Sequence, residues 1–296
     1  MIHQWRGGVG VRRLAFCPTL ANLSCSGALM GEAKMIARWM LLALAMFALP
    51  VEAKVVGEEV EYRAGETTLK GYLAYDDSVK GARPGILVVH EWWGQNAYAR
   101  KRARMLAALG YTALALDMYG EGRQATHPEE AGKFAGEIRN HMALAEARFR
   151  AALALLQQQP TVDPAQIGAI GYCFGGGIVL EMARRGLPLK AVASFHGSLA
   201  TGHPATPGSI KGRLFIANGA DDPLTTPEQI TAFKQEMANA GVDYSFVNYP
   251  GARHSFTNPD ADRLAAKYHL PLGYNAAADK ESWAQMRRMF RQVFGR

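Results

Sequence analysis

Cysteine is scarce in this chain of 296 residues, which has only three, at positions 17, 25 and 173. The first two lie in an N-terminal segment outside the expected fold, so one thiol, Cys173, remains. A lone cysteine excludes an intramolecular disulfide, and in an oxidising compartment an unpaired thiol persists where it is buried or needed. Burial as a small hydrophobe is the common fate of a free cysteine. The residues around Cys173 therefore have to decide between packing and chemistry.

Long hydrophobic runs are also missing. The apolar run at 39–49 is eleven residues long, whereas a transmembrane helix needs about 20. Arg38 precedes this run and small residues up to Ala53 follow it, which is the pattern of a secretory signal peptide. We predict an N-terminal extension, 1–53, whose residues 35–53 are a signal cleaved after Ala53, and export to the periplasm or the medium. An uncleaved N-terminal anchor is the alternative.

A strong excess of one charge is lacking as well. Residues 1–53 hold five of the 33 Lys and Arg residues and two of the 26 Asp and Glu residues, so residues 54–296 carry a net charge of +4. The one basic cluster, 100–104, has no aromatic residues among its cations, whereas nucleic-acid binding requires a basic stripe on a recognisable module. We interpret this cluster as a solvated helix face. The sequence predicts no nucleic-acid partner, no metal or cofactor, and no stable membrane insertion after processing.

From residue 55 onward, short apolar runs alternate with longer amphipathic stretches. Continuous apolar runs are typical of strands buried on both faces, and strands that alternate with helices of ten or more residues predict a mainly parallel sheet. No linker or repeat interrupts the pattern, so residues 54–296 are predicted to form one α/β domain. After a hairpin around Gly65, strands are predicted at 85–90, 112–117, 167–171, 191–195, 214–218 and 244–249. Helices are predicted at 96–109, 128–158 with a break near Gly136, 175–185, 227–240 and 280–294.

Cys173 lies in the segment Gly171-Tyr-Cys-Phe-Gly175, between a predicted strand and a predicted helix. A nucleophile elbow needs this setting, because its sharp turn lifts the nucleophile above the sheet and small residues on either side let the backbone pass. The N-terminus of the following helix supplies partial positive charge, which favours a thiolate. We therefore interpret Cys173 as a nucleophile.

An elbow nucleophile needs a general base and an orienting acid, which follow it in the order acid, then histidine. The segment Gly219-Ala-Asp-Asp222 follows one predicted strand and offers Asp221 or Asp222, and His254 follows the last strand. Both loops lie at carboxyl ends of strands, where α/β sheets bind their ligands. His196, which precedes the acid loop, is expected to line the pocket instead.

Backbone amides for a developing oxyanion are expected from the residue after the nucleophile, Phe174, and from the loop after an earlier strand, at Trp92. Each such donor is worth about 3 kcal/mol when it is lost. Two other motifs are excluded. His90-Glu91 does not continue as the zinc-binding motif H-E-x-x-H. The segment with glycines at 120 and 122 is similar to a dinucleotide-binding fingerprint, but no helix begins directly after it to bind the phosphates.

Five segments of the chain resemble dienelactone hydrolases in order and spacing, over roughly 55–295. They are His90-Glu-Trp-Trp-Gly94, Asp117-Met-Tyr-Gly120, Gly171-Tyr-Cys-Phe-Gly-Gly176, Gly219-Ala-Asp-Asp222 and Gly251-Ala-Arg-His-Ser-Phe256. The resemblance implies an α/β-hydrolase fold, with a mainly parallel central sheet and helices on both faces. It implies Asp222 as the acid of a Cys-His-Asp triad that hydrolyses an ester or lactone through an acyl-enzyme. It also implies that Glu91 holds the resting thiol and leaves it when substrate binds, with a buried ion-pair partner as the alternative role.

The same resemblance bears on substrate binding. Dienelactone hydrolases hold a carboxylate-bearing lactone with arginines, one of them shortly after the catalytic histidine. In this chain Asn258 is near that place, and Arg123 matches the other arginine loosely. We therefore expect neutral esters or lactones to be hydrolysed at least as well as dienelactone itself. Trp93, Tyr119 and His196 complete the expected substrate contacts. A catalytically silent small-ligand-binding protein on the same scaffold is the second hypothesis.

Overall fold

The computed structural model describes residues 54–295, so the predicted signal peptide lies outside the described residues. The described part is built on an eight-stranded sheet with the strand order β1-β2-β4-β3-β5-β6-β7-β8. The first two strands form the predicted hairpin and pair antiparallel, and the six strands from β4 to β8 in this order are parallel. The strands are β1 (Val55–Ala64), β2 (Thr67–Asp76), β3 (Arg83–Val89), β4 (Thr112–Leu116), β5 (Val162–Tyr172), β6 (Ala191–Phe195), β7 (Arg213–Gly219) and β8 (Tyr244–Tyr249).

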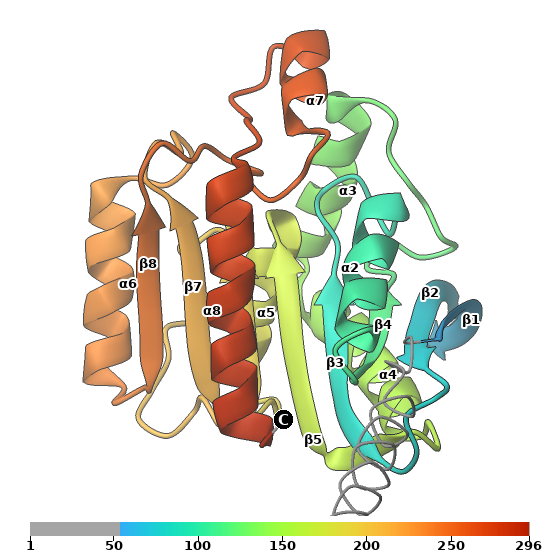
Figure 1. Cartoon of the computed structure of the whole chain (residues 1–296). Helices are drawn as coiled ribbons and strands as arrows, with labels where there is room; N and C mark the ends of the chain where they lie inside the picture. The colour runs from blue at the N-terminus through green and yellow to red at the C-terminus, as the bar shows by residue number, and fades with distance from the viewer. Residues whose placement is uncertain (1–53, 296) are drawn as a thin grey trace, which may run out of the picture. The chain divides into compact units, whose positions relative to one another are not determined.

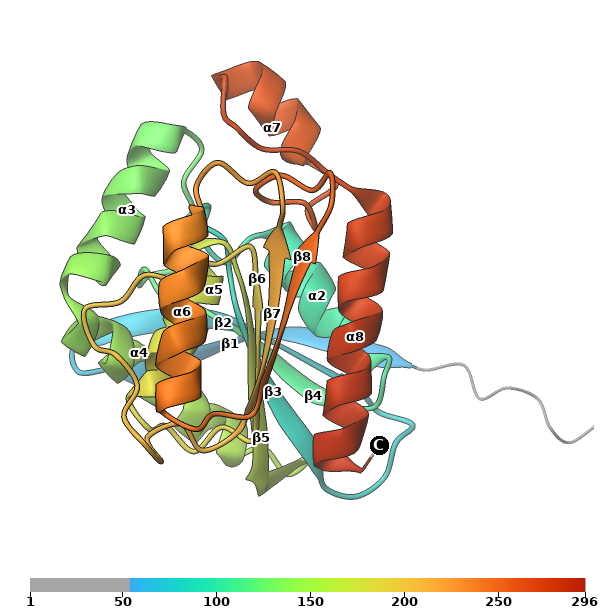
Figure 2. The same ribbon diagram turned by 90° about the vertical axis from the view of Figure 1, so that its left-hand side faces the viewer.

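Helices cover both faces of this sheet (Figures 1 and 2). In β3 the fully buried Leu87 packs in one apolar cluster with residues of α4, α5 and α6, and its neighbour Val88 packs in a second cluster with residues of α2 and α8. A strand buried on both faces needs apolar residues at consecutive positions. The predicted fold class is confirmed. The helices are α2 (Ala97–Ala107), α3 (Pro128–Asn140), α4 (Met142–Gln157), α5 (Phe174–Arg184), α6 (Pro227–Asn239), α7 (Ala261–Tyr268) and α8 (Ala276–Phe294).

The structure corrects two predicted elements. The break in the long helical stretch falls at His141, which leaves the helical conformation with φ −127° and ψ 67°, and not near Gly136. The short helix α7 was not predicted; it ends at His269, whose backbone is left-handed. No helix among residues 54–295 is long and apolar enough to cross a membrane.

The parallel strands bring the predicted chemical loops together. Because β3, β5, β7 and β8 run in the same direction, the segments that follow them lie at one edge of the sheet, and α7 lies above this edge in Figure 1. The loops carrying Trp92, Cys173, Asp222 and His254 all begin there. This edge is therefore the place to look for a catalytic site.

Candidate active site

The turn between β5 and α5 holds Cys173 in a strained backbone conformation, with φ 52° and ψ −116°. A conformation of this kind costs on the order of 1–3 kcal/mol and persists where its surroundings enforce it. A Cβ atom on Gly171 would lie 2.0 Å from the carbonyl oxygen of Gly175, and one on Gly175 would lie 2.4 Å from that of Val89. The glycines of the motif are therefore required because the turn is packed backbone against backbone.

Three predicted residues meet above this turn. Nε2 of His254 lies 3.0 Å from Sγ of Cys173, and Nδ1 of His254 lies 2.8 Å from Oδ2 of Asp222. Asp222 is 4% exposed and its other carboxylate oxygen accepts the backbone N–H of Leu224 at 2.8 Å. The neighbouring Asp221 is exposed. Of the two aspartates left open by the loop sequence, the structure brings Asp222 to the histidine.

The electrostatics of this group favour a charged imidazolium. Burial on its own lowers the pKa of His254, but the negative charges of Cys173 and Asp222 and their hydrogen bonds outweigh burial and raise that pKa to about 10. The ring nitrogen that faces Asp222 carries a proton in either state, since a carboxylate can only accept. The second proton is the one that passes between the ring and the sulfur.

The two residues whose amides are predicted to stabilise an oxyanion, Phe174 and Trp92, lie on segments that meet at the elbow. Phe174 is the first residue of α5, where helical hydrogen bonding leaves N–H groups without an intrahelical partner. The next amide, of Gly175, donates to the carbonyl oxygen of His90 at 3.1 Å, which fixes the loop of Trp92 against the elbow. Trp92 and Phe174 both line the cavity that contains Cys173 and His254.

Glu91 precedes Trp92 in this loop and is 2% exposed. Ser255 donates its hydroxyl to Oε1 at 2.9 Å, and Asn258 donates its amide to Oε2 at 2.6 Å. Burial raises the pKa of Glu91, and the two hydrogen bonds oppose this rise. The hydrogen-bond partner of the sulfur is His254. The arrangement in which Glu91 holds the thiol is therefore not the one found in the structure.

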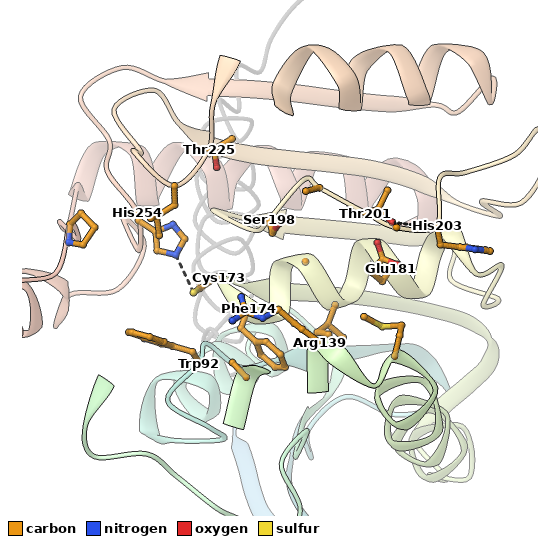
Figure 3. Close-up of a pocket in the computed structure, with 18 of the residues that line it drawn as sticks. Trp92, Arg139, Cys173, Phe174, Glu181, Ser198, Thr201, His203, Thr225 and His254 are labelled. Carbon is orange, nitrogen blue, oxygen red and sulfur yellow. Dashed lines mark hydrogen bonds between the residues drawn. The ribbon is translucent and has the colours of Figure 1, made fainter. Parts of the chain in front are cut away.

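A cavity of about 840 Å³ opens in front of Cys173. Figure 3 shows Cys173 and His254 on one side of it, with Trp92 and Phe174 beside them and Ser198 and Thr201 across it. Much of the remaining wall is apolar, with two arginines among it. These further wall residues include Met142, Ile178, Leu224, Leu270, Leu272, Arg139 and Arg185.

The five residues predicted to contact substrate are not among those that line this cavity. Arg123 turns its guanidinium to the carbonyl oxygen of Tyr119, with Nε at 3.0 Å, and lies over the ring of Phe134. Tyr119 is fully buried and donates its hydroxyl to the carbonyl oxygen of Trp92 at 3.0 Å. Both side chains therefore have partners within the protein, and Tyr119 supports the loop of Trp92.

The other three are also in the layer behind the cavity. Trp93 is 6% exposed and packs in a separate apolar cluster with Ala125 and Ala131. Asn258 donates its amide to Glu91, and His196 accepts the backbone N–H of Cys173. Sequence reasoning assigned these residues to the pocket because they are near the motifs in the chain, but the side chains of Trp93, Asn258 and His196 are buried away from the cavity.

Most of the cavity wall was missed by sequence reasoning, including its two arginines, Arg139 and Arg185. Arg185 lies on the face of α5 that begins with Phe174 and continues through Ile178 and Glu181, and Arg139 lies one turn after Ala135 on α3. Spacings of three, four and seven residues place side chains on one helical face. The helix after a nucleophile elbow presents one face to the pocket, and this spacing is the signal that would have found Arg185.

Comparisons with known proteins identify the family of this chain. The model of the dienelactone hydrolase family matches residues 69–294. A protein of Synechocystis sp. named "Putative carboxymethylenebutenolidase" is 33% identical, over 75% of this chain and 91% of its own length. The solved structure named m3DLH is 40% identical, with a TM-score of 0.76, and covers 81% of this chain and 99% of its own.

A dienelactone hydrolase-like promiscuous phosphotriesterase from metagenomic libraries is similar to the same extent. It is 36% identical, with a TM-score of 0.74, over 81% of this chain and 99% of its own. The family match covers most of the chain, and the relatives match it along nearly their whole length. This chain therefore belongs to the dienelactone hydrolase family and is a hydrolase with the α/β-hydrolase fold.

Proposed function

We propose that this hydrolase cleaves ester or lactone bonds by covalent catalysis, with Cys173 as nucleophile, His254 as base and Asp222 as the orienting acid. Membership of the dienelactone hydrolase family supports the class of bond. The observation that carries the residue assignment is the pair of contacts at His254, 3.0 Å to Sγ and 2.8 Å to Oδ2, at the wall of a cavity large enough for a small molecule.

In the first half of the reaction the proton of the thiol resides on His254 and the thiolate attacks the carbonyl carbon. The negative charge moves to the carbonyl oxygen, where the amides of Trp92 and Phe174 donate to it. The tetrahedral intermediate collapses and the C–O bond breaks. His254 gives its proton to the leaving alkoxide, which departs as the alcohol or, for a lactone, stays attached as the opened chain.

In the second half a water molecule attacks the thioester. His254 takes a proton from this water, the same two amides hold the oxyanion, and the C–S bond breaks. The acid is released, and the proton on His254 returns to the sulfur. Asp222 keeps the imidazole in one orientation and stabilises its positive charge in both halves. Glu91 serves this cycle indirectly, because it ties the loop of Trp92 to Ser255 next to the base.

The test is turnover of an activated neutral ester, p-nitrophenyl acetate, by residues 54–296 and by the Cys173→Ala variant. We expect turnover that is lost in the variant, and a stoichiometric acyl-enzyme on rapid mixing. Turnover that persists in Cys173→Ala would contradict the mechanism. Binding of small esters without turnover in either protein would favour the silent binding protein instead.

We also propose that the chain is exported. The support is the sequence of residues 35–53 alone, with its basic start, short apolar core and small-residue end. N-terminal sequencing of protein from the periplasmic fraction should begin near Lys54. A cytoplasmic product that begins at Met1 or Met35 would contradict export and leave the hydrolase assignment unaffected.

A further inference from the structure

His196 directs both ring nitrogens at the catalytic machinery without reaching the cavity. Nδ1 accepts the backbone N–H of Cys173 at 3.0 Å, and Nε2 lies 2.7 Å from the hydroxyl oxygen of Thr257. The side chain is 1% exposed and does not line the cavity. His196 therefore contacts the nucleophile from the side that no substrate approaches.

These two contacts fix the protonation state of the ring. An imidazole nitrogen that accepts a hydrogen bond carries no proton, so the ring proton is on Nε2 and is donated to Thr257. A charged imidazolium would carry a proton on Nδ1 and could not accept the amide of Cys173 there. Burial, followed by the positive charges of His254 and Arg102, lowers the pKa of His196 well below its usual value, which keeps the ring neutral.

Thr257 is itself held rigidly. It follows the base by three residues, and the oxygens of its hydroxyl and of the Tyr98 hydroxyl are 2.7 Å apart. Its carbonyl oxygen accepts from the guanidinium of Arg102 at 2.6 Å, and Arg102 in turn pairs with Asp279 of α8 at 2.6 Å. The far end of the contact from His196 is therefore anchored to α2 and α8.

The backbone around the nucleophile needs such support. Cys173 is strained, and its N–H is shared between His196 and the carbonyl oxygen of Phe195, each at 3.0 Å. His196 also has a positive φ, 41°, which is uncommon for a residue other than glycine. One hydrogen bond thus joins two residues of unusual backbone conformation, each directly after one of two neighbouring strands.

We propose that His196 is a positioning residue for the reaction. Its neutral ring connects the amide of Cys173 to Thr257 on the loop of the base, and this connection sets the distance between the sulfur and Nε2 of His254. The proposal rests on the proposed Cys-His mechanism. It replaces the pocket-lining role expected for His196 from the sequence.

The experiment compares His196→Leu with His196→Asn. The Asn side chain places an acceptor oxygen near the position of Nδ1, whereas Leu has no acceptor. We expect His196→Leu to lower kcat about ten- to a hundred-fold with little change in KM, because a small misplacement of the reacting groups costs about that much. We expect His196→Asn to retain most of the wild-type kcat. Alkylation of Cys173 by iodoacetamide at pH 7 should be slower in His196→Leu than in the wild type, and unchanged in His196→Asn.

Thermal melting of both variants separates positioning from stability, and His127→Leu, at an exposed histidine, serves as the control for a general effect of the substitution. Equal kcat in Leu and Asn, whether both fall or both stay at the wild-type value, would overturn the proposal. Cys173→Ala is measured alongside. If it retains activity, the proposed function fails and this proposal with it, whereas an inactive Cys173→Ala with a fully active His196→Leu overturns the role of His196 alone.

Thr257 provides an independent variant in case His196→Leu does not fold. Thr257→Val removes the hydroxyl that accepts the hydrogen bond from Nε2 of His196, and Thr257→Ser keeps this hydroxyl. We expect Val to lower kcat about three- to ten-fold, in line with the loss of one hydrogen bond, and Ser to restore it. An equal kcat for Val and Ser would show that the hydroxyl does not matter and would overturn the proposed connection.

Discussion

The buried polar side chains behind Cys173 differ from the polar side chains of the cavity wall in front of it. The difference lies in how many of their hydrogen bonds and ion pairs are made within the protein. Behind it, Glu91 and His196 are at most 2% exposed, and each has two hydrogen bonds from neighbouring loops. In front, Arg139 is exposed to the cavity and has no hydrogen bond or ion pair within residues 54–295. Arg185, on the same wall, has a single side-chain hydrogen bond, to Glu146 at 3.3 Å.

This difference has a physical cause and a consequence. A buried polar group without a partner costs about 1–3 kcal/mol, so the layer behind the nucleophile is stable only when its groups are paired. A cavity wall is open to solvent and to ligands, which can supply the missing partners. We infer that the buried layer sets the reactivity of Cys173 and that the cavity wall sets which substrate is chosen. Substitutions in the buried layer and at the cavity wall test this division.

Removal of the nucleophile or of the base should have the largest effect. Cys173→Ala and His254→Ala are each expected to lower kcat by about four to six orders of magnitude, because neither residue acts without the other. The double variant should lose little more than either single variant. Steady-state kinetics with p-nitrophenyl acetate measures this, and losses that multiply in the double variant would contradict a shared mechanism.

The two aspartates of one loop provide a matched pair for the next effect. Asp222→Asn should lower kcat by about two to four orders of magnitude, since the imidazolium loses the charge that orients and stabilises it. It should also lower the pKa of His254 from about 10, because one of its two negative neighbours is removed. Asp221→Asn, at an exposed carboxylate, should leave kcat and the titration of His254 unchanged. The reverse result would reassign the acid.

Glu91→Gln tests the buried layer through stability as well as activity. Both carboxylate oxygens accept hydrogen bonds, and the Gln amide can replace only one acceptor. The free energy of unfolding should fall by about 1–3 kcal/mol, measured by urea denaturation. Activity should fall less than in Asp222→Asn, because Glu91 does not contact the sulfur in the structure. A loss of kcat as large as that of Cys173→Ala would indicate the direct role on the thiol that the family resemblance implies.

The division between the two layers also explains what the sequence could predict. Cys173 and His254 could be chosen as candidates because covalent catalysis requires those residue types after particular strands, and Gly171 because the tight turn excludes a side chain. Asp222 could not be distinguished from Asp221 by position alone, since both follow the same strand. The family resemblance favoured Asp222. The structure places it at the histidine.

Substrate contacts were predicted poorly for a different reason. Trp93 and Asn258 are close in sequence to the candidate catalytic residues, but the rotation of a side chain toward the cavity or the core is fixed by tertiary packing. Arg139 and Arg185 lie on helix faces far in sequence from the base, and only the packing of α3 and α5 brings them to the cavity. Motifs record what chemistry requires, whereas the wall of a cavity depends on how helices are docked.

The smallest expected effect concerns charge selectivity at that wall. The family resemblance placed carboxylate recognition at Arg123 and Asn258, but neither lines the cavity, and Asn258 is engaged with Glu91. Arg139 and Arg185 are the guanidinium groups that do line it. Arg185 is partly neutralised by an ion pair with Glu146 at 3.3 Å, which leaves Arg139 as the freer charge.

We therefore expect Arg139→Gln to lower kcat/KM for a carboxylate-bearing ester about three- to ten-fold, a modest factor because the group is exposed and screened by solvent. A neutral ester of the same size should be unaffected. Arg123→Gln is the matched control, since its guanidinium is held by the carbonyl oxygen of Tyr119 outside the cavity. The measurement is kcat/KM for the neutral and anionic pair in all three proteins. Suppose that Arg123→Gln changes the ratio of kcat/KM between the anionic and the neutral ester and Arg139→Gln does not. The substrate carboxylate is then recognised outside this cavity wall, and the proposed division between the buried layer and the wall is wrong.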